Sequence, residues 1–391
     1  MLHRISLLRT LTALALAAAA GCAADPNYGA LDASATPDGN SPDADNTPDI
    51  HNNPVPPPAP VVAAGVRWVG RVDVTSSPDH PRFSWSGSGF VATFTGTSLA
   101  ADLMITGSAQ IFKAVVDGAP QAPFTATSGQ GTHMLASGLA AGVHTVEVYR
   151  QTEGPQGETR LMGLTVGGGT LMDPPAGKSR LIEVIGDSIT CGYGNLGTLS
   201  DTDCYPTESH WDTYEAIAAR ALDAEVSTIA ASGRGIVRNY DPNDTSARMP
   251  MFYPRAVANA PTPAWDFHVE PNAVIINLGT NDISNNKGDP GDAFRDTYQL
   301  LLATVRAYYP HTYIVCIIAP LLSGSDLSTI GGHIKAAVDA RVAAGDTKVE
   351  FFSSIPAQST DKFACQYHPN VAENQAMSDL LVPELKSKLG W

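Results

Sequence analysis

The chain has 391 residues, of which 43% are hydrophobic, so it is long enough for two or three domains with buried cores. Its formal net charge of −15, with no run of Lys or Arg, excludes a nucleic-acid-binding protein, because phosphate recognition needs basic patches. The sequence has neither a C-x-x-C nor an H-E-x-x-H motif, so we expect no metal site and no cofactor.

Residues 1–22 have the pattern of a bacterial lipoprotein signal peptide. Two arginines precede an apolar stretch, Leu11 to Ala20, that is too short to span a bilayer. Small residues then lead to Cys22, which we predict to be acylated and to anchor an extracytoplasmic lipoprotein in the outer membrane or at the cell surface. The alternative is an ordinary secretion signal cut after a nearby Ala, which would release the protein.

Residues 23–60 are expected to form a disordered acidic and Pro-rich linker. The segment is rich in Pro, Asp, Asn, Ala and Ser and has almost no aromatic or β-branched residues, so it cannot bury enough surface to fold. Its Pro-rich end should be stiff and extended. We therefore expect a tether between the membrane and the folded part of the chain.

Residues 61–175 predict a β-sandwich, in the form of a jelly roll. Short runs with a period close to two, such as Phe90–Phe94, Leu99–Leu103 and Thr145–Tyr149, are separated by Gly, Ser and Pro turns. Asp117-Gly118 is a hairpin-type turn signal within this region. Regularly spaced short strands of this kind favour a sandwich over a mixed fold.

Residues 176–391 alternate between strand and helix patterns. Five strands with intervening helices predict an α/β fold with a doubly wound, parallel, five-stranded sheet, which places its site outside the carboxyl ends of the strands. The five apolar runs are Leu181–Ile185, Val226–Ala230, Ala273–Leu278, Tyr313–Ile318 and Val349–Phe352.

Three residues with chemical potential follow the first three of these strands. Ser188 follows the first strand, Gly233 the second and Asn281 the third, so they should meet at one edge of the sheet. Ser188 can supply a nucleophile, although the alternative is an ordinary helix N-cap. The backbone N–H groups of Ser188 and Gly233 and the Asn281 amide can hold an oxyanion, although a strand-to-loop glycine and a satisfied turn asparagine are the alternatives.

A base is also needed, and the late His368-Pro369 pair supplies one. We prefer His368 to the other histidines of this region, which are His210, His268, His311 and His333. No G-x-S-x-G motif surrounds the serine, so the α/β-hydrolase class is disfavoured. Asp187 and Asp282 are predicted to support the site by accepting hydrogen bonds from backbone N–H groups in its loops.

The runs Ile185–Thr190, Gly279–Asp282 and Tyr367–Asn370, in this order, resemble the motifs of the SGNH (GDSL) hydrolase superfamily. The residues that give that superfamily its name correspond here to Ser188, Gly233, Asn281 and His368. Such an enzyme uses its serine as the nucleophile and its histidine as the base.

Further runs, Arg67–Arg71, Phe83–Phe90 and Ile189–Asn195, resemble carbohydrate esterase family 2 over most of residues 65–391. That resemblance implies a serine esterase that removes O-acetyl groups from plant polysaccharides or their oligosaccharides through an acetyl-enzyme. We expect a monomer whose partner is the acetylated glycan. The alternatives are an esterase of lipid or cell-wall acetyl esters, and an inactive polysaccharide-binding lipoprotein.

Aromatic residues are predicted to contact the sugar. Related members stack an aromatic ring beside the catalytic His on their substrate, and Tyr367 holds that place here. Trp265 and Trp211 are weaker candidates, and the alternative for both is the protein core.

The superfamily pattern has an Asp three residues before its His, whereas this chain has Cys365 there. A thiol cannot stabilise an imidazolium as a carboxylate does. Either His368 acts with Ser188 alone, its Nδ1–H held by a backbone carbonyl, or a more distant acid such as Asp361 reaches the ring. We favour the dyad, for which family 2 is known, and expect substitution of Cys365 to be mild.

The remaining cysteines are assigned from their positions. Cys191 and Cys204 lie close together in one loop region and are predicted to form a disulfide, since exported proteins meet an oxidising environment. Cys316 lies in the middle of a strand and is predicted to be a buried free thiol.

Overall fold

The computed structural model describes residues 65–391, so the predicted signal peptide, Cys22 and the predicted linker lie outside the described residues. Among the residues described, no helix is both long and apolar enough to cross a membrane.

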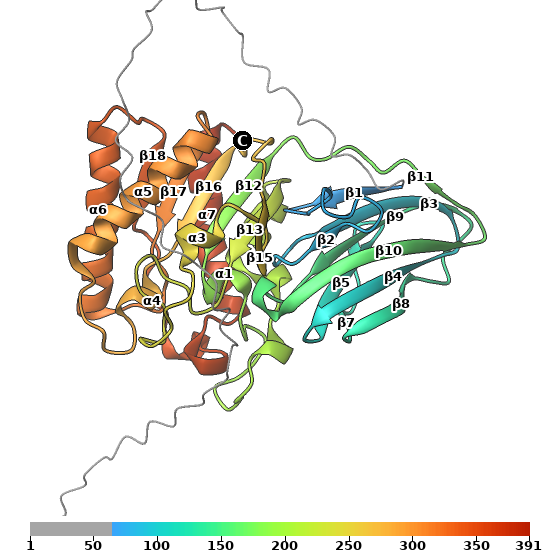
Figure 1. The fold of residues 1–391 in the computed structure, drawn as a ribbon, viewed down its shortest axis with the longest axis horizontal. Helices are drawn as coiled ribbons and strands as arrows, with labels where there is room; N and C mark the ends of the chain where they lie inside the picture. The colour runs from blue at the N-terminus through green and yellow to red at the C-terminus, as the bar shows by residue number, and fades with distance from the viewer. Residues whose placement is uncertain (1–64) are drawn as a thin grey trace, which may run out of the picture. The chain divides into compact units, whose positions relative to one another are not determined.

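The first part of the described chain forms two antiparallel sheets that share one core (Figure 1). Side chains from both sheets, among them Phe90, Phe94 and Leu103, are completely buried in this core, as the period-two pattern predicts. The larger sheet has the order β1 (Val66–Val69), β3 (Gly89–Gly96), β9 (Gly142–Arg150), β5 (Gln110–Val116) and β6 (Ala119–Pro120), with β11 (Thr170–Met172) paired to β3 and β7 (Phe124–Ala126) to β5. The smaller sheet has the order β2 (Arg82–Phe83), β10 (Gly157–Gly167), β4 (Ser98–Gly107) and β8 (Gly129–Ala136).

The second part is built on a parallel sheet of five strands, which confirms the predicted fold class. Its order is β13 (Glu225–Ala230), β12 (Leu181–Gly186), β16 (Ala273–Asn277), β17 (Tyr313–Ile317) and β18 (Val349–Phe352). Gly186 at the end of β12 pairs with Ala230 of β13 and with Asn277 of β16. The three strands that precede the predicted site therefore end level with one another.

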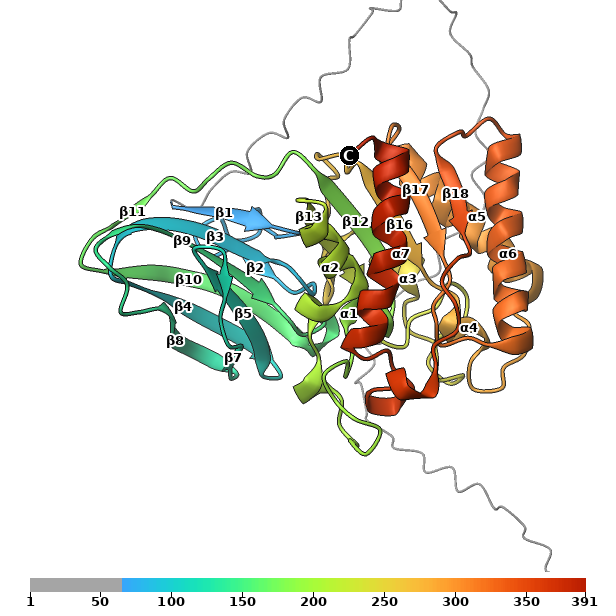
Figure 2. The same cartoon turned by 180° about the vertical axis from the view of Figure 1, so that it is seen from behind.

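Helices cover both faces of this sheet, because successive strand residues point to opposite sides. In β16, Val274 and Ile276 join the core formed with the long helices α5 and α6, whereas Ala273 and Ile275 join the core formed with α2 and α7. Figure 2 shows α2 and α7 in front of the sheet. The helices are α1 (Ser188–Cys191), α2 (Tyr214–Ala221), α3 (Met249–Phe252), α4 (Thr280–Ile283), α5 (Gly291–Tyr308), α6 (Gly324–Ala343) and α7 (Val371–Leu389).

Buried polar contacts join the sandwich to the parallel-sheet part. The guanidinium of Arg71, which is fully buried, forms an ion pair with Glu183 of β12 at 3.0 Å. The indole N–H of buried Trp85 donates to the carbonyl oxygen of Ala256, in the hairpin of β14 (Arg255–Val257) and β15 (Ala260–Ala264), at 3.1 Å. Breaking a buried ion pair of this kind costs several kcal/mol, about 3–5, so the two parts are firmly attached.

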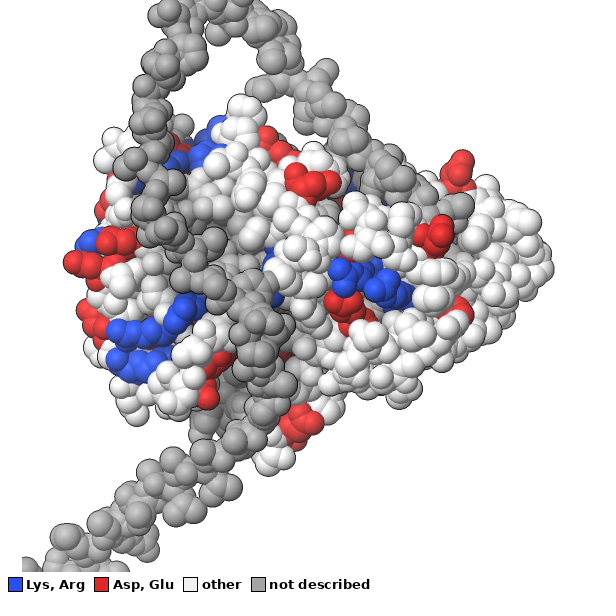
Figure 3. Space-filling model, viewed as in Figure 1, with Lys and Arg blue, Asp and Glu red and all other residues white. Residues whose placement is uncertain are grey.

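On one face of the molecule, the surface of the sandwich carries few charges. Figure 3 shows charged side chains sparse over its strands on the face drawn, whereas acidic and basic groups are interspersed over the helices of the second part. A surface with few charges is compatible with a neutral ligand.

Candidate active site

Ser188 is the first residue of α1, directly after the central strand β12. Its hydroxyl Oγ lies 2.8 Å from Nε2 of His368, and its side chain is almost entirely buried. Asp187 is the N-cap of the helix, accepting a hydrogen bond from the backbone N–H of Ile189 at 3.1 Å. The alternative that Ser188 is only an N-cap is therefore wrong, because the neighbouring aspartate has that position and the serine faces an imidazole.

His368 follows the short 3₁₀ helix η5 (Cys365–Tyr367) and is held on its other ring nitrogen. Its Nδ1 lies 3.3 Å from the carbonyl oxygen of Cys365, which fixes Nδ1 as the protonated nitrogen and Nε2 as the acceptor for Ser188. The edge of the ring packs against Tyr193, with ring centroids 5.0 Å apart. Desolvation lowers the pKa of His368 to about 4, against the raising effect of the backbone at Cys365 and Gln366. The imidazole is therefore neutral near pH 7 and can accept a proton.

No carboxylate is bonded to His368 in the described part of the chain. Asp361, the distant acid considered above, lies on the surface in η4 (Thr360–Lys362) and accepts a hydrogen bond from Ser359. The structure thus agrees with the expected Ser–His dyad, in which a backbone carbonyl orients the base.

The predicted disulfide between Cys191 and Cys204 is wrong. Cys204 is bonded to Cys365, which is 161 residues away in the sequence. Cys191 is a buried free thiol at the end of α1, and its Sγ donates to the Glu153 carboxylate at 3.6 Å. The helix directs Cys191 inward, whereas the chain beyond it returns to the His368 loop and brings Cys204 there. Cys316 is a buried free thiol, as predicted.

Gly233 and Asn281 reach the same edge of the sheet from the next two strands. Gly233 has φ +75°, a left-handed conformation that suits glycine, and its carbonyl accepts a hydrogen bond from the Tyr240 N–H at 2.8 Å. The Asn281 amide nitrogen donates to Asp187 Oδ2 at 3.2 Å and to the carbonyl oxygen of Arg234 at 2.9 Å. Asn281 therefore connects the turn at Asp187 and Ser188 with the loop after β13 that carries Gly233 and Arg234, here called the glycine loop. Its donation to an oxyanion stays a prediction.

The two supporting aspartates have different surroundings. Burial, together with the nearby Asp282 charge, raises the pKa of Asp187 to about 7. Burial also raises the pKa of Asp282, although its carboxylate accepts hydrogen bonds from the backbone N–H groups of Ile236, Val237 and Arg238 at 2.9, 2.7 and 2.9 Å. Asp282 thus holds the loop that carries Gly233, which is the supporting role expected for it.

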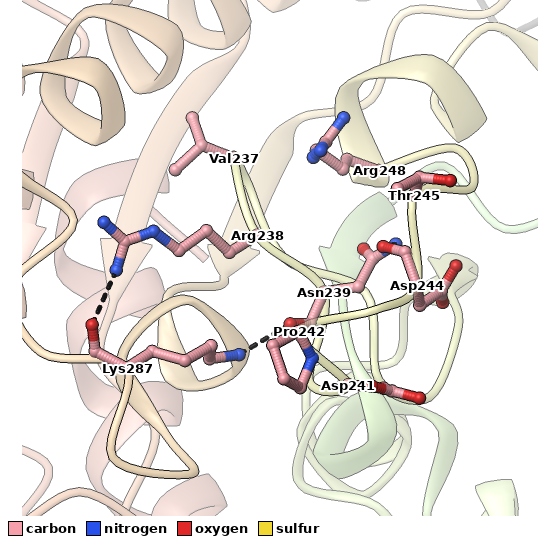
Figure 4. Close-up of a pocket in the computed structure, with 9 residues that line it drawn as sticks. All are labelled: Val237, Arg238, Asn239, Asp241, Pro242, Asp244, Thr245, Arg248 and Lys287. Atoms are coloured by element: carbon pink, nitrogen blue, oxygen red, sulfur yellow. Dashed lines mark hydrogen bonds between the residues drawn. The ribbon is translucent and has the colours of Figure 1, made fainter.

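A polar pocket of about 350 Å³ lies beside the glycine loop (Figure 4). Two of the cations that line it donate to backbone carbonyls: Arg238 to Lys287 and Gly288, both at 3.1 Å, and Lys287 to Asn239 at 2.6 Å, to Tyr240 at 3.1 Å and to Asn281. These bonds hold the loop after β13, which carries Gly233, against the segment after β16, which carries Asn281.

Glu153 is a supporting residue that the sequence analysis missed. It lies in the sandwich, between β9 and the 3₁₀ helix η1 (Gly154–Gln156), and its buried carboxylate accepts the backbone N–H of Ser232 at 2.6 Å. Desolvation is the main cause that raises the pKa of Glu153. Ser232 directly precedes Gly233, so the sandwich contributes to the geometry of the site. No local pattern marks this glutamate, because its partner is 79 residues away.

The aromatic candidates are placed differently. Tyr367 is 62% exposed directly beside His368, and its ring meets the Phe363 ring edge-on with centroids 5.5 Å apart. Tyr193, which the sequence analysis did not single out, packs on both His368 and Tyr205. Tyr367 is therefore an exposed side chain next to the base in the chain, and its contact with a sugar stays a prediction.

The structure does not bring the two tryptophans to this site. The Trp265 ring lies under the Arg71 guanidinium, whose Cζ is 5.5 Å from the ring centroid. That arginine pairs with Glu183, which lies in the middle of β12 and not at its carboxyl end. The backbone N–H of Trp265 is bonded to Pro254 at 2.7 Å, which holds the ring at the sandwich junction. Trp211 packs against the Arg220 guanidinium at 4.0 Å.

The parallel sheet with a serine and a histidine at its carboxyl edge defines a hydrolase of the SGNH type. Residues 68–175 match the family described as "Carbohydrate esterase 2 N-terminal", and residues 184–376 match the "GDSL-like Lipase/Acylhydrolase family". The structure of a family two carbohydrate esterase from Clostridium thermocellum, in complex with cellohexaose, is 36% identical with a TM-score of 0.80, over 84% of this chain and 100% of that one. The chain belongs to carbohydrate esterase family 2, as its motifs predicted.

Two curated relatives extend the comparison. Cellulase/esterase CelE of Acetivibrio thermocellus is 36% identical over 331 residues, which are 84% of this chain and 40% of that relative. This chain therefore spans less than half of its length. An acetylxylan esterase / glucomannan deacetylase of Cellvibrio japonicus is 26% identical over 318 residues, 79% of this chain and 85% of the relative.

Proposed function

We propose that this protein is a serine esterase that removes O-acetyl groups from plant polysaccharides or from their oligosaccharides. The observation that carries the proposal is the 2.8 Å contact between Ser188 Oγ and His368 Nε2, at the edge where Gly233 and Asn281 also lie. Relatives that cover most of the folded chain are named for the same reaction class.

The geometry indicates how the residues divide the reaction. His368 Nε2 accepts the Ser188 proton while Oγ attacks the acetyl carbonyl carbon. The resulting oxyanion is held by the N–H groups of Ser188 and Gly233, each donor being worth roughly 3 kcal/mol. The Asn281 amide becomes a third donor by releasing one of its two acceptors, Asp187 or the Arg234 carbonyl. The sugar oxygen then leaves with the proton from His368, which gives acetyl-Ser188 and a free hydroxyl. Water repeats the sequence on the acetyl-enzyme and releases acetate.

The surroundings of the site favour a sugar over a lipid. Tyr367 offers an open ring beside the base, and stacking on a pyranose buries apolar C–H surface. The sandwich strands carry few charges on the face shown in Figure 3, which suits a neutral glycan.

Acetate release separates this proposal from its alternatives. We expect the enzyme to release acetate from acetylated xylan or glucomannan, and the Ser188→Ala variant to release none while its circular dichroism spectrum is unchanged. Retention of more than a few per cent of activity in that variant would contradict the nucleophile. Hydrolysis of acetyl lipids or cell-wall acetyl esters without hydrolysis of plant glycans would favour the other esterase class.

We also propose that the enzyme is a lipoprotein anchored through Cys22. The support is the apolar stretch of the signal, the small residues before Cys22 and the acidic segment after it. A Cys22→Ser variant should appear in the soluble fraction with unchanged kcat on p-nitrophenyl acetate. A mature N-terminus at another residue, without acyl mass, would contradict the anchor.

A further inference from the structure

The residue that stands where the superfamily has its triad Asp is half of a disulfide. Cys365 is bonded to Cys204 and both side chains are fully buried, so neither sulfur is available as a thiol. The contribution of Cys365 to the base is its carbonyl oxygen, which accepts from the His368 backbone N–H at 3.1 Å and faces Nδ1 at 3.3 Å. The orientation of the imidazole therefore depends on where the backbone of Cys365 lies.

That backbone belongs to a turn that needs external support. Gln366 has φ 49° and Tyr367 has φ 66°, both in the left-handed region that residues with a Cβ avoid. Within the turn, the Ala364 N–H donates to the His368 carbonyl at 2.7 Å. Bonds inside the turn fix its shape, but they do not fix its distance from Ser188.

The disulfide supplies a connection to the nucleophile loop. Cys204 lies in the connecting segment that follows α1, the helix that begins with Ser188. Gly194 lies in the same segment, and the Cys365 N–H points to its carbonyl oxygen at 3.4 Å. Gly194 packs so closely that an added Cβ would lie 2.7 Å from the Cβ of Cys365 and 2.8 Å from that of Cys204. The base loop and the nucleophile loop are thus pressed together at the sulfur bridge.

We propose that the Cys204–Cys365 disulfide positions the catalytic base: it locks the Cys365 carbonyl so that His368 presents Nε2 to Ser188. The bridge supplies the orienting part of the role that the absent carboxylate has in a triad, without its charge. Both cysteines are positioning residues, and the expectation of a mild effect at Cys365, which considered only its thiol, is withdrawn. The proposal rests on the proposed Ser–His chemistry but not on the identity of the glycan.

A double-mutant cycle on full-length enzyme tests the proposal, with p-nitrophenyl acetate as substrate. Because the bridge needs both sulfurs, Cys204→Ser, Cys365→Ser and the double variant should each lose kcat by about 10- to 100-fold, as expected for a misplaced base, with KM changed less than twofold. Cys316→Ala, which removes a buried thiol remote from the site, is the matched control and should keep wild-type kcat. All assays are run well below each variant's unfolding temperature.

A second readout distinguishes positioning from general loosening. The ¹⁵N NMR signals of His368 should report a single Nδ1–H tautomer in the wild type and a mixture of tautomers in the double variant. Any one of three results would overturn the proposal. The first is a double variant whose kcat stays within twofold of wild type, and the second is a double-variant loss equal to the product of the two single-variant losses. The third is a peptide map that shows Cys191 in the bridge. Complete loss of hydrolysis in Ser188→Ala tests the proposed function separately, so the two failures are distinguishable.

Discussion

Glu153 offers a sharp test of the idea that the sandwich shapes the active site. Its carboxylate accepts the Ser232 N–H at 2.6 Å, one residue before the predicted oxyanion donor Gly233. Glu153→Ala leaves that buried N–H without an acceptor, which costs about 1–3 kcal/mol. If the loop relieves this cost by moving, the Gly233 donor is misplaced, and one lost donor corresponds to about 3 kcal/mol in the transition state.

We therefore expect Glu153→Ala to lower kcat by about 10- to 100-fold, with a smaller change in KM, since the loss concerns an interaction made in the transition state. Glu153→Gln keeps an acceptor oxygen of the same reach. The Ser232 N–H therefore keeps its acceptor, and this variant should stay within about fivefold of wild type.

The assay is steady-state hydrolysis of p-nitrophenyl acetate and of an acetylated xylo-oligosaccharide, below the unfolding temperature of each variant. Glu158→Ala is the matched control, because it removes a sandwich carboxylate that pairs with Arg82 at 3.1 Å and not with the site. Wild-type kcat in Glu153→Ala, or an equal loss in Glu158→Ala, would refute the reasoning.

Three further predictions concern the base, the surface acid Asp361 and the exposed aromatic ring of Tyr367. Because desolvation lowers the pKa of His368 to about 4, the ring should stay uncharged until pH falls through about 4. An NMR pH titration of the His368 imidazole with its midpoint near 6.5 would contradict this. Asp361→Asn should keep kcat within about threefold, since the carboxylate lies on the surface and is bonded to Ser359, and a thousandfold loss would show that it is recruited as a triad acid. Tyr367→Ala should lower kcat/KM more on acetylated saccharides than on p-nitrophenyl acetate, by a factor that corresponds to about 1–3 kcal/mol of transition-state free energy. Equal losses on both substrates would show that the ring only supports His368.

The sequence alone determined the layered architecture and the main chemistry. Apolar runs of four to six residues between helical patterns predict parallel strands, and parallel strands of one sheet present their carboxyl ends on the same side. That topological rule placed Ser188, Gly233 and Asn281 together before any contact was known, and the level ends of β12, β13 and β16 agree with it. The His-Pro motif then supplied the base.

Only the tertiary structure decided which groups support these residues. The partner of Cys204 is 161 residues away in the sequence, and the glutamate that accepts the N–H beside Gly233 is 79 residues from its partner. Proximity in sequence suggested Cys191, but a four-residue helix turned that side chain inward. Sequence periodicity indicates which face of a helix or strand is buried, because burial is a property of each position. Disulfide and hydrogen-bond partners depend on where whole loops meet in space, and no single position in the sequence encodes that.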